Sequence, residues 1–319
     1  MRNAMNPILL RTDISACFDA KGETTACPGS GRDAAYGVLD QRGRFTVDGP
    51  LVHDALTGAV WLRDANPESF PLTWEEARAV TARMTAQKAH GLGDWQLPTR
   101  RALFSLVSHD AVNPSLPSGH PFTNVFTGYY WTSESCNRLP AQAWHIHLGG
   151  GRVVKANKTD ASLVWPVCLP VTGAGALPPA ARAARFAPER GLALDTLTGL
   201  YWSLDADAAR RPLRWEEAIA FVEELNAKNW LGCADWRLPN VRELESLADL
   251  SADSPALAPG HPFTGVREGY WSSTTSIYEP RYAWTLYTRD GMVGVGFKAD
   301  PEFYCWPVRG GLEFNPSSK

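Results

Sequence analysis

Apolar residues recur at helical spacing in two stretches of the chain, one in each half. The stripe of the first stretch is formed by Trp74, Ala77, Val80 and Met84. The stripe of the second is formed by Trp215, Ala218, Phe221, Val222 and Leu225. Thr73 and Glu76 make a capping box in front of the first stripe, whereas Arg214 replaces the threonine in front of the second. This periodicity predicts one amphipathic helix in each half, with its apolar face packed in a core.

A shorter helix is predicted after each Leu-Pro segment. Thr99 is its N-cap in the first half, and Asn240 with Glu243 forms a capping box in the second. Strand-like segments occupy residues 56–62, 129–133, 143–148, 152–158 and 163–167, and Gly-rich turns at 149–151 and 290–291 connect the middle strands. This order predicts an α+β fold, in which two helices pack on a small, mainly antiparallel sheet in each half.

The two halves are copies of one another. Segments 54–61, 74–77, 94–98 and 119–123 return as 195–202, 215–218, 235–239 and 260–264, and 195 − 54 and 235 − 94 both give 141. A period this long is a whole duplicated domain, because solenoid repeats are about 20–50 residues long. The predicted organisation is an N-terminal extension (1–43), a first repeat (44–168), a Pro/Gly/Ala-rich linker (169–184), a second repeat (185–311) and a tail (312–319).

The alignment of the copies shifts once. The offset falls from 141 at Tyr129 and Tyr270 to 140 at Trp131 and Trp271, and it is 141 again at Trp165 and Trp306. We therefore expect the two repeats to adopt one fold, with Tyr130 as a single inserted residue.

Charge and hydropathy exclude several classes of partner. The net charge is −3 without a block of like charges, so a broad nucleic-acid surface is not expected. No apolar run is long enough to insert into a membrane, and the apolar stretch at the start is too short for a signal peptide.

The six cysteines fall two to the extension and two to each repeat. This partition favours local disulfides, Cys17–Cys27, Cys136–Cys168 and Cys233–Cys305, formed in an oxidising compartment. The alternative is buried free thiols in a cytosolic protein. No Cys-x-x-Cys is present, and His145 and His147 lack a third ligand, so we expect neither a metal nor another cofactor.

Several motifs in a fixed order resemble one family. They are Leu-Thr-Gly-Leu-Tyr-Trp at 197–202, Trp-Glu-Glu-Ala at 215–218, Asp-Trp-Arg-Leu-Pro at 235–239 and Tyr-Trp-Ser-Ser-Thr at 270–274. Together they resemble the DUF1566 family, also called the Lcl C-terminal domain, in two tandem copies. The first copy departs from the pattern at Gln96 and Glu134. The resemblance covers most of residues 13–310, and the segment around Cys17 and Cys27 is similar to the lead-in of secreted members.

The resemblance implies a C-type-lectin-like fold, bacterial export, and adhesion or ligand binding. The namesake's domain is associated with sulfated glycans. Lectin-like domains commonly join the first helix region to the last strand by a disulfide, which Cys233 and Cys305 would form here. Calcium-dependent sugar binding of the lectin type is not expected, because Arg281 stands where that motif has an asparagine.

Candidate binding residues lie in the loops where the copies differ most. In the second repeat they are Tyr278, Glu279, Arg281 and Tyr282, and in the first they are Glu134, Asn137 and Arg138. The alternative is an ordinary solvated loop. The charged residues at matched positions, Asp94, Arg101, Asp235 and Arg242, are instead expected to be part of the scaffold.

The sequence therefore predicts an exported surface or secreted protein, extracellular or periplasmic, that binds a glycan or a protein without catalysis. One alternative is a structural subunit of a pilus, fibre or phage-related assembly. A lesser one is an oxidase like the formylglycine-generating enzymes. No catalytic residues are predicted, because neither a reactive thiol pair nor a matched nucleophile and base recurs in both copies. A homo-oligomer or larger assembly is left open.

Overall fold

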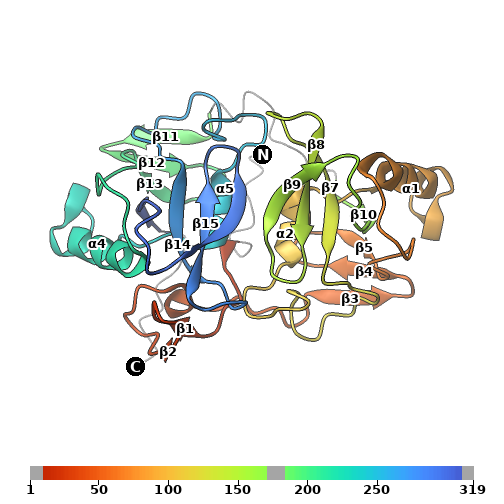
Figure 1. The fold of residues 1–319 in the computed structure, drawn as a ribbon, viewed down its shortest axis with the longest axis horizontal. Coiled ribbons are helices and arrows are strands. Elements are labelled where there is room, and N and C mark those ends of the chain that lie inside the picture. Colours follow the sequence, from red (N-terminus) through yellow and green to blue (C-terminus); the bar gives the residue numbers. More distant parts are fainter. Residues whose placement is uncertain (1–9, 171–183, 311–319) are drawn as a thin grey trace. The chain divides into compact units, whose positions relative to one another are not determined.

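The computed structural model describes residues 10–170 and 184–310 (Figure 1). The chain divides into two compact units, one made of Met1–Leu39 with Leu177–Lys319 and the other of Asp40–Ala176. The start of the chain, most of the expected linker (169–184) and the expected tail (312–319) lie outside the described residues.

The first repeat is built from two antiparallel sheets and two α-helices. One sheet has the strand order β3-β4-β5-β10-β6, and β7, β8 and β9 form a meander. The elements are β3 (Phe45–Asp48), β4 (Leu51–Asp54), β5 (Val60–Leu62), α1 (Trp74–Ala86), the 3-10 turn η3 (Ala89–Gly91), β6 (Trp95–Gln96), α2 (Arg100–Leu106), β7 (Tyr129–Ser135), β8 (Gln142–His147), β9 (Val153–Asn157) and β10 (Val167–Cys168).

The second repeat has the same order of elements, except that the counterpart of β6 is a single bridge between Arg237 and Val308. Its sheets are β11-β12-β13-β17 and the meander β14-β15-β16. The elements are β11 (Phe186–Glu189), β12 (Leu192–Asp195), β13 (Tyr201–Ser203), α4 (Trp215–Ala227), η4 (Trp230–Gly232), α5 (Val241–Leu247), β14 (Gly269–Thr275), β15 (Tyr282–Tyr287), β16 (Met292–Phe297) and β17 (Val308–Arg309). The expected α+β architecture is confirmed, with four α-helices among the described residues.

The helices begin where the sequence predicts. Thr73 and Glu76 form the capping box of α1, Asn240 and Glu243 that of α5, and Thr99 caps α2. The apolar stripes of α1 and α4 face the core of their own repeat. In the second repeat, Trp215, Ala218 and Val222 pack with Trp271 and the other buried residues of that core.

Buried tryptophans fix the helices to the strands through their indole N–H groups. Trp74 donates to the carbonyl of Thr132 at 2.8 Å, and its counterpart Trp215 donates to that of Ser272 at 2.7 Å. Trp131 and Trp271 donate in turn to the carbonyls of Leu72 and Leu213. A buried indole N–H requires a partner, so these bonds specify where each helix lies on its meander.

A buried ion pair recurs at the same place in both repeats. Arg44 and Asp54 form a two-pronged pair with side chains at most 1% exposed. Arg185 and Asp195 repeat it, and Arg185 also donates to the carbonyl of Ser246 in α5 at 2.8 Å. Each aspartate accepts bonds from its own turn as well, since Asp195 binds the amide of Leu197 and the hydroxyl of Thr198. The pair thus joins the first hairpin of the repeat to its short helix.

The scaffold role expected for Asp94 and Asp235 is not supported by burial. Asp94 is exposed, and Asp235 is 55% exposed and pairs with Arg309 at 2.7 Å. Arg242 is buried and Arg101 is half-buried. Asp54 and Asp195 are the buried carboxylates with the role that we expected of Asp94 and Asp235, because their side chains are fully enclosed and hydrogen-bonded.

The register places the inserted residue elsewhere than predicted. The hydroxyl of Tyr130 accepts a bond from the amide of Phe126, and that of Tyr270 accepts one from Arg267. Tyr130 is therefore the counterpart of Tyr270, at an offset of 140. The extra residue of the first repeat lies just before β7, after Phe126, and the prediction of Tyr130 as the insertion is wrong.

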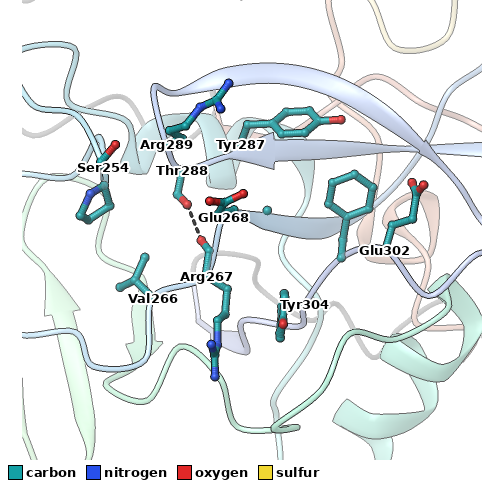
Figure 2. A pocket seen from close by; sticks show the side chains of 12 residues that line it. Ser254, Val266, Arg267, Glu268, Tyr287, Thr288, Arg289, Glu302 and Tyr304 are labelled. Carbon is teal, nitrogen blue, oxygen red and sulfur yellow. Dashed lines mark hydrogen bonds between the residues drawn. The ribbon is translucent and has the colours of Figure 1, made fainter. Parts of the chain in front are cut away.

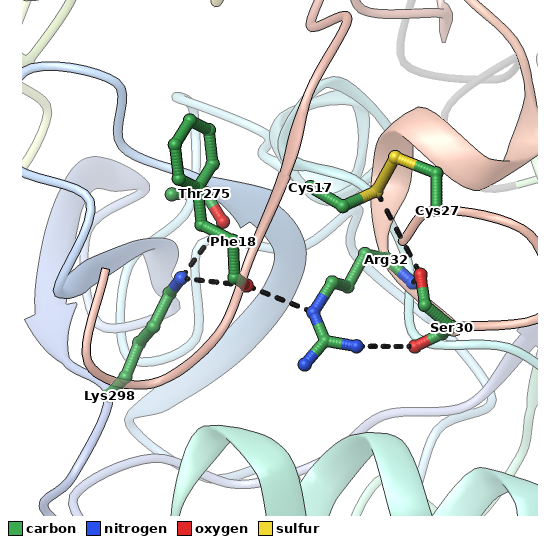
Figure 3. The surroundings of a disulfide bond; sticks show 7 residues. All are labelled: Cys17, Phe18, Cys27, Ser30, Arg32, Thr275 and Lys298. Carbon is green, nitrogen blue, oxygen red and sulfur yellow. Dashed lines mark hydrogen bonds between the residues drawn. A yellow bond between two sulfur atoms is a disulfide. The ribbon is translucent and has the colours of Figure 1, made fainter. Parts of the chain in front are cut away.

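The N-terminal extension packs on the second repeat. Its elements are β1 (Cys17–Phe18), β2 (Thr24–Thr25) and the 3-10 turn η2 (Asp33–Tyr36). Figure 3 shows Lys298 reaching this segment, where its ammonium donates to the carbonyls of Phe18 and Asp19 and to the hydroxyl of Thr275. Burial lowers the pKa of Lys298 to about 7, and the ring of Trp215 lies 4.1 Å from its ammonium.

The extension supplies the second repeat with two charged groups. In the first repeat the matching groups come from that repeat's own residues. Arg32 lies over Trp215 and pairs with Glu216, whereas in the first repeat Arg78 lies over Trp74 and pairs with Glu75. The second charged group is a carboxylate near the start of the short helix. Asp33 accepts a bond from Thr274, whose hydroxyl binds the first amide of α5, whereas Glu134 binds the first amide of α2 directly. Residues 10–39 therefore complete the second repeat.

Only one of the three expected disulfides is formed. Cys17 and Cys27 are bonded, with Cα atoms 5.3 Å apart, while Cys136, Cys168, Cys233 and Cys305 are free thiols. Cys305 lies in the core beneath α4, whereas the thiol of Cys233 turns back to the carbonyl of Leu231 in the loop. Cys136 follows β7 and Cys168 lies in β10 of the other sheet, so the members of these two pairs belong to different parts of the repeat.

We predict that Asp195→Ala lowers the free energy of unfolding by about 3–5 kcal/mol, because Arg185 is left buried without its partner. Asp235→Ala is the control, and removing its exposed pair should change stability by about 0–1 kcal/mol. Urea unfolding of both variants measures the difference. Equal effects would contradict the assignment of the scaffold role to Asp195.

We also predict the thiol count. Protein unfolded without reductant should titrate four thiols per chain, and reduction should release two more from Cys17 and Cys27. A count of two or fewer before reduction would mean that Cys136, Cys168, Cys233 or Cys305 form further disulfides.

Candidate functional site

A cleft of about 610 Å³ opens on the second repeat. Figure 2 shows the three segments that surround it, which come from distant parts of the repeat. They are residues 266–269 at the start of β14, residues 287–289 at the end of β15, and residues 302–304 ahead of β17, with Ser254 and Pro255 at the rim. The volume is in the usual range for a small-ligand site.

Four charged side chains line the cleft, namely Arg267, Glu268, Arg289 and Glu302. Arg267 is anchored, because its Nε and Nη2 atoms both donate to Oδ2 of Asp207, a residue that is 1% exposed. Its backbone is held as well, since its amide donates to Tyr270 and its carbonyl accepts the hydroxyl of Thr288. Arg289 is more open, with 56% of its side chain exposed.

Three aromatic residues form the rest of the wall. Phe303 meets Tyr287 edge to face, with ring centroids 5.5 Å apart, and Tyr304 lies under the guanidinium of Arg267 at 5.3 Å. Phe303 fits only because residue 269 is glycine, since a Cβ atom there would lie 2.6 Å from its ring. The cleft therefore combines apolar ring surface with planar charged groups.

The matching strand position of the first repeat carries a large side chain in place of Gly269. Tyr129 takes the register position of Gly269, and its ring stacks on His145 at 4.1 Å. His145 also contacts the hydroxyl of Ser162 at 3.1 Å, and burial lowers the pKa of its imidazole to about 4. His145 and His147 thus belong to an aromatic cluster with Tyr129. Within residues 10–170 and 184–310, no three His, Cys, Asp or Glu residues gather as metal ligands.

The loop residues predicted in the second repeat lie away from the cleft. Tyr278 is 61% exposed, and Glu279 and Arg281 pair with each other at 3.0 Å. Tyr282 packs against Phe297. This loop joins β14 to β15 at one end of the hairpin, whereas the cleft adjoins the other end, where Gly269 pairs with Tyr287.

The loop residues predicted in the first repeat have different surroundings. The carboxylate of Glu134 accepts two contacts from the amide of Arg100, so it is a helix cap, and burial raises its pKa. Asn137 and Arg138 are exposed between β7 and β8. The candidate residues of the two loops are thus not part of the cleft.

The sequence did contain a signal for the cleft, in the differences between the copies. Arg267, Arg289 and Glu302 stand where the first repeat has Phe126, Gly149 and Ala161. These positions are at the ends of strands and ahead of β17, outside the loops in which the sequence predicts binding residues.

The family profile of the Lcl C-terminal domain matches residues 50–168 and again residues 191–309. The chain belongs to the Lcl C-terminal domain family. No curated protein matches it. In the part of the chain that the structure describes, no helix is long and apolar enough to cross a membrane.

The two Lcl domains share their scaffold and differ in their surfaces. The buried pairs Arg44–Asp54 and Arg185–Asp195 and the tryptophan–carbonyl bonds are common to both. The charged and aromatic lining of the cleft belongs to the second Lcl domain alone. The buried pairs and the tryptophan–carbonyl bonds thus belong to the shared scaffold, and the charged lining of the cleft does not.

We predict that Gly269→Ala disturbs the cleft and lowers the free energy of unfolding by about 1–3 kcal/mol, because the new Cβ overlaps Phe303. Gly128→Ala in the first Lcl domain is the control, since its Cβ would meet Leu163 at an ordinary 3.4 Å. Thermal unfolding of both variants tests the prediction, and equal melting temperatures would show that the wall at Phe303 is not packed as described.

Proposed function

We propose that the protein is an exported, non-enzymatic binding protein whose second Lcl domain recognises a polar ligand, a glycan or a protein, at a surface. The observation that carries this proposal is the cleft, whose charged residues Arg267, Arg289 and Glu302 are replaced by uncharged residues at the matching positions of the first domain. A residue set needed only for folding would recur in both domains, as the buried Arg–Asp pairs do.

The proposal includes a C-type-lectin-like fold for each domain. Its support is the family membership together with two helices packed on small antiparallel sheets. In such a fold the long connections on a rigid scaffold carry recognition.

Export is supported by the Cys17–Cys27 disulfide, which persists in an oxidising compartment. The disulfide closes the segment that holds Lys298 and Arg32 against the second domain. A reducing compartment would loosen this segment, so the location and the fold are consistent with each other.

The absence of catalysis is part of the proposal. Burial raises the pKa of the Cys168 thiol to about 11 and that of Cys305 further, so these thiols stay protonated at neutral pH. The nucleophile in thiol chemistry is the thiolate. Cys168 and Cys305 are therefore poor candidates for the reactive thiol of an oxidase.

Binding of the purified full chain to arrayed glycans and immobilised extracellular proteins tests the proposal. We expect saturable binding that Arg289→Glu abolishes, because it reverses a charge of the cleft lining; Arg289 also lies 4.0 Å from the buried carboxylate of Asp290, so the melting temperature of the variant is measured alongside. Glu279→Arg is the control outside the cleft and should bind as wild type. Absence of binding, together with filaments in electron micrographs, would favour a structural subunit instead.

A further inference from the structure

Lys298 of the second Lcl domain is the residue on which the N-terminal extension docks. Its ammonium donates to the carbonyls of Phe18 and Asp19 and to the hydroxyl of Thr275 (Figure 3). The ring of Trp215 lies 4.1 Å from the same ammonium, and the lysine is 0% exposed. One lysine on a tryptophan thus binds two consecutive backbone carbonyl groups of the docked segment.

The docked segment is a tight turn formed by residues 19–23. The amide of Gly22 donates to the carbonyl of Asp19 at 3.1 Å, and the Asp19 carboxylate accepts two further amides of the turn. Gly22 has a φ of 83°, and a Cβ atom there would lie 3.1 Å from the backbone nitrogen of Arg281. The glycine therefore lets the turn approach the loop between β14 and β15 closely.

The first Lcl domain has the same lysine on the same tryptophan. Lys158 corresponds to Lys298, because each carbonyl accepts the first amide of the long helix, at 3.0 Å from Trp74 and 3.1 Å from Trp215. Each lysine amide also donates to the loop that joins the first two strands of its meander. The ammonium of Lys158 lies 4.3 Å from the Trp74 ring. The docking position is therefore repeated in the first domain.

This face is open in the first domain. Lys158 is half-buried, whereas Lys298 is fully enclosed. Ser135 has the strand register of Thr275 and is half-buried as well, whereas Thr275 is 3% exposed. In the described part of the chain, the Lys158 ammonium contacts the Trp74 ring and no hydrogen-bond acceptor. The donors that hold the extension in one domain are thus available in the other.

The first domain does not need a covering segment for its own stability. Arg78 and Glu134 supply the charged groups that the second domain receives from the extension. The loop beside Lys158 is exposed, and it presents Leu139 at 46% exposure next to Pro140, the counterpart of the proline that the extension approaches. Apolar surface and an unused charged donor therefore lie side by side.

We infer that the first Lcl domain binds a tight turn of another polypeptide at the face formed by Trp74, Ser135, Ala141 and Lys158. Lys158 donates to consecutive backbone carbonyl groups of that turn, since an ammonium has three donors and a carbonyl only accepts. The occupied face of the second domain shows this contact already made within one chain. The site is separate from the cleft and does not depend on the proposed function.

A labelled peptide of residues 15–29, closed by its own disulfide, is the probe for this face. It is titrated by fluorescence anisotropy against the full chain, whose own extension already covers the second domain. We expect one saturable site per chain. Lys158→Met should weaken binding about tenfold or more, because it removes the charged donor and keeps the apolar stem. Lys88→Met, at an exposed lysine just after α1, is the matched control and should have no effect.

Two further variants separate the contact from a folding defect. Ala141→Glu adds a carboxylate beside Lys158 at an exposed position, and it should weaken binding as strongly without lowering the melting temperature. A probe with Gly22→Val should not bind, because the new side chain blocks the approach of the two backbones.

Three results would overturn the inference. They are the absence of binding, equal binding of the Gly22→Val probe, and binding that neither Lys158→Met nor Ala141→Glu weakens. The last result would mean that the probe exchanges with the extension on the second domain. Each of them leaves the cleft and the proposed function untouched.

Discussion

A buried arginine–aspartate pair supports each Lcl domain. Arg185 and Asp195 lie in the first hairpin of the second domain. The Arg185 guanidinium also donates a hydrogen bond to a backbone carbonyl of α5. Because a charge without its partner is costly to bury, the hairpin, the turn at 195–199 and the short helix must assemble together. The bonds from the tryptophan indoles then set the meander against the longer helix. The cleft lies at the edge of this assembly, so its lining can change without altering what holds the domain.

The N-terminal extension supplies the second domain with charged groups that the first domain has in its own chain. The first domain places a guanidinium over Trp74 and a carboxylate at the start of α2 from its own chain, at Arg78 and Glu134. The second domain has Ile219 and Thr274 at these positions and receives Arg32 and Asp33 from residues before the first domain. The same electrostatic requirement is thus met by two routes, one local and one through a disulfide-closed segment.

The sequence predicted the features that depend on local chemistry. Helix starts at Thr73 and Asn240 follow from capping, the core faces of α1 and α4 follow from periodicity, and the duplication follows from the constant offset. What it did not predict depends on tertiary proximity. The partition of the cysteines gives no distance between Cys233 and Cys305, and nothing local indicates that Asp33 reaches Thr274. The cleft was missed because Arg267, Arg289 and Glu302 are distant in sequence and meet only when β14, β15 and the segment before β17 are packed.

We propose that recognition resides in the cleft of the second domain and is separable from the shared scaffold. The most direct measurement gives the second domain the residues of the first at two positions, Arg289→Gly with Glu302→Ala, and compares ligand binding and melting temperature with those of wild type. We expect binding to be lost while the melting temperature is unchanged, because both side chains are exposed. Retained binding by this correctly folded variant would contradict it.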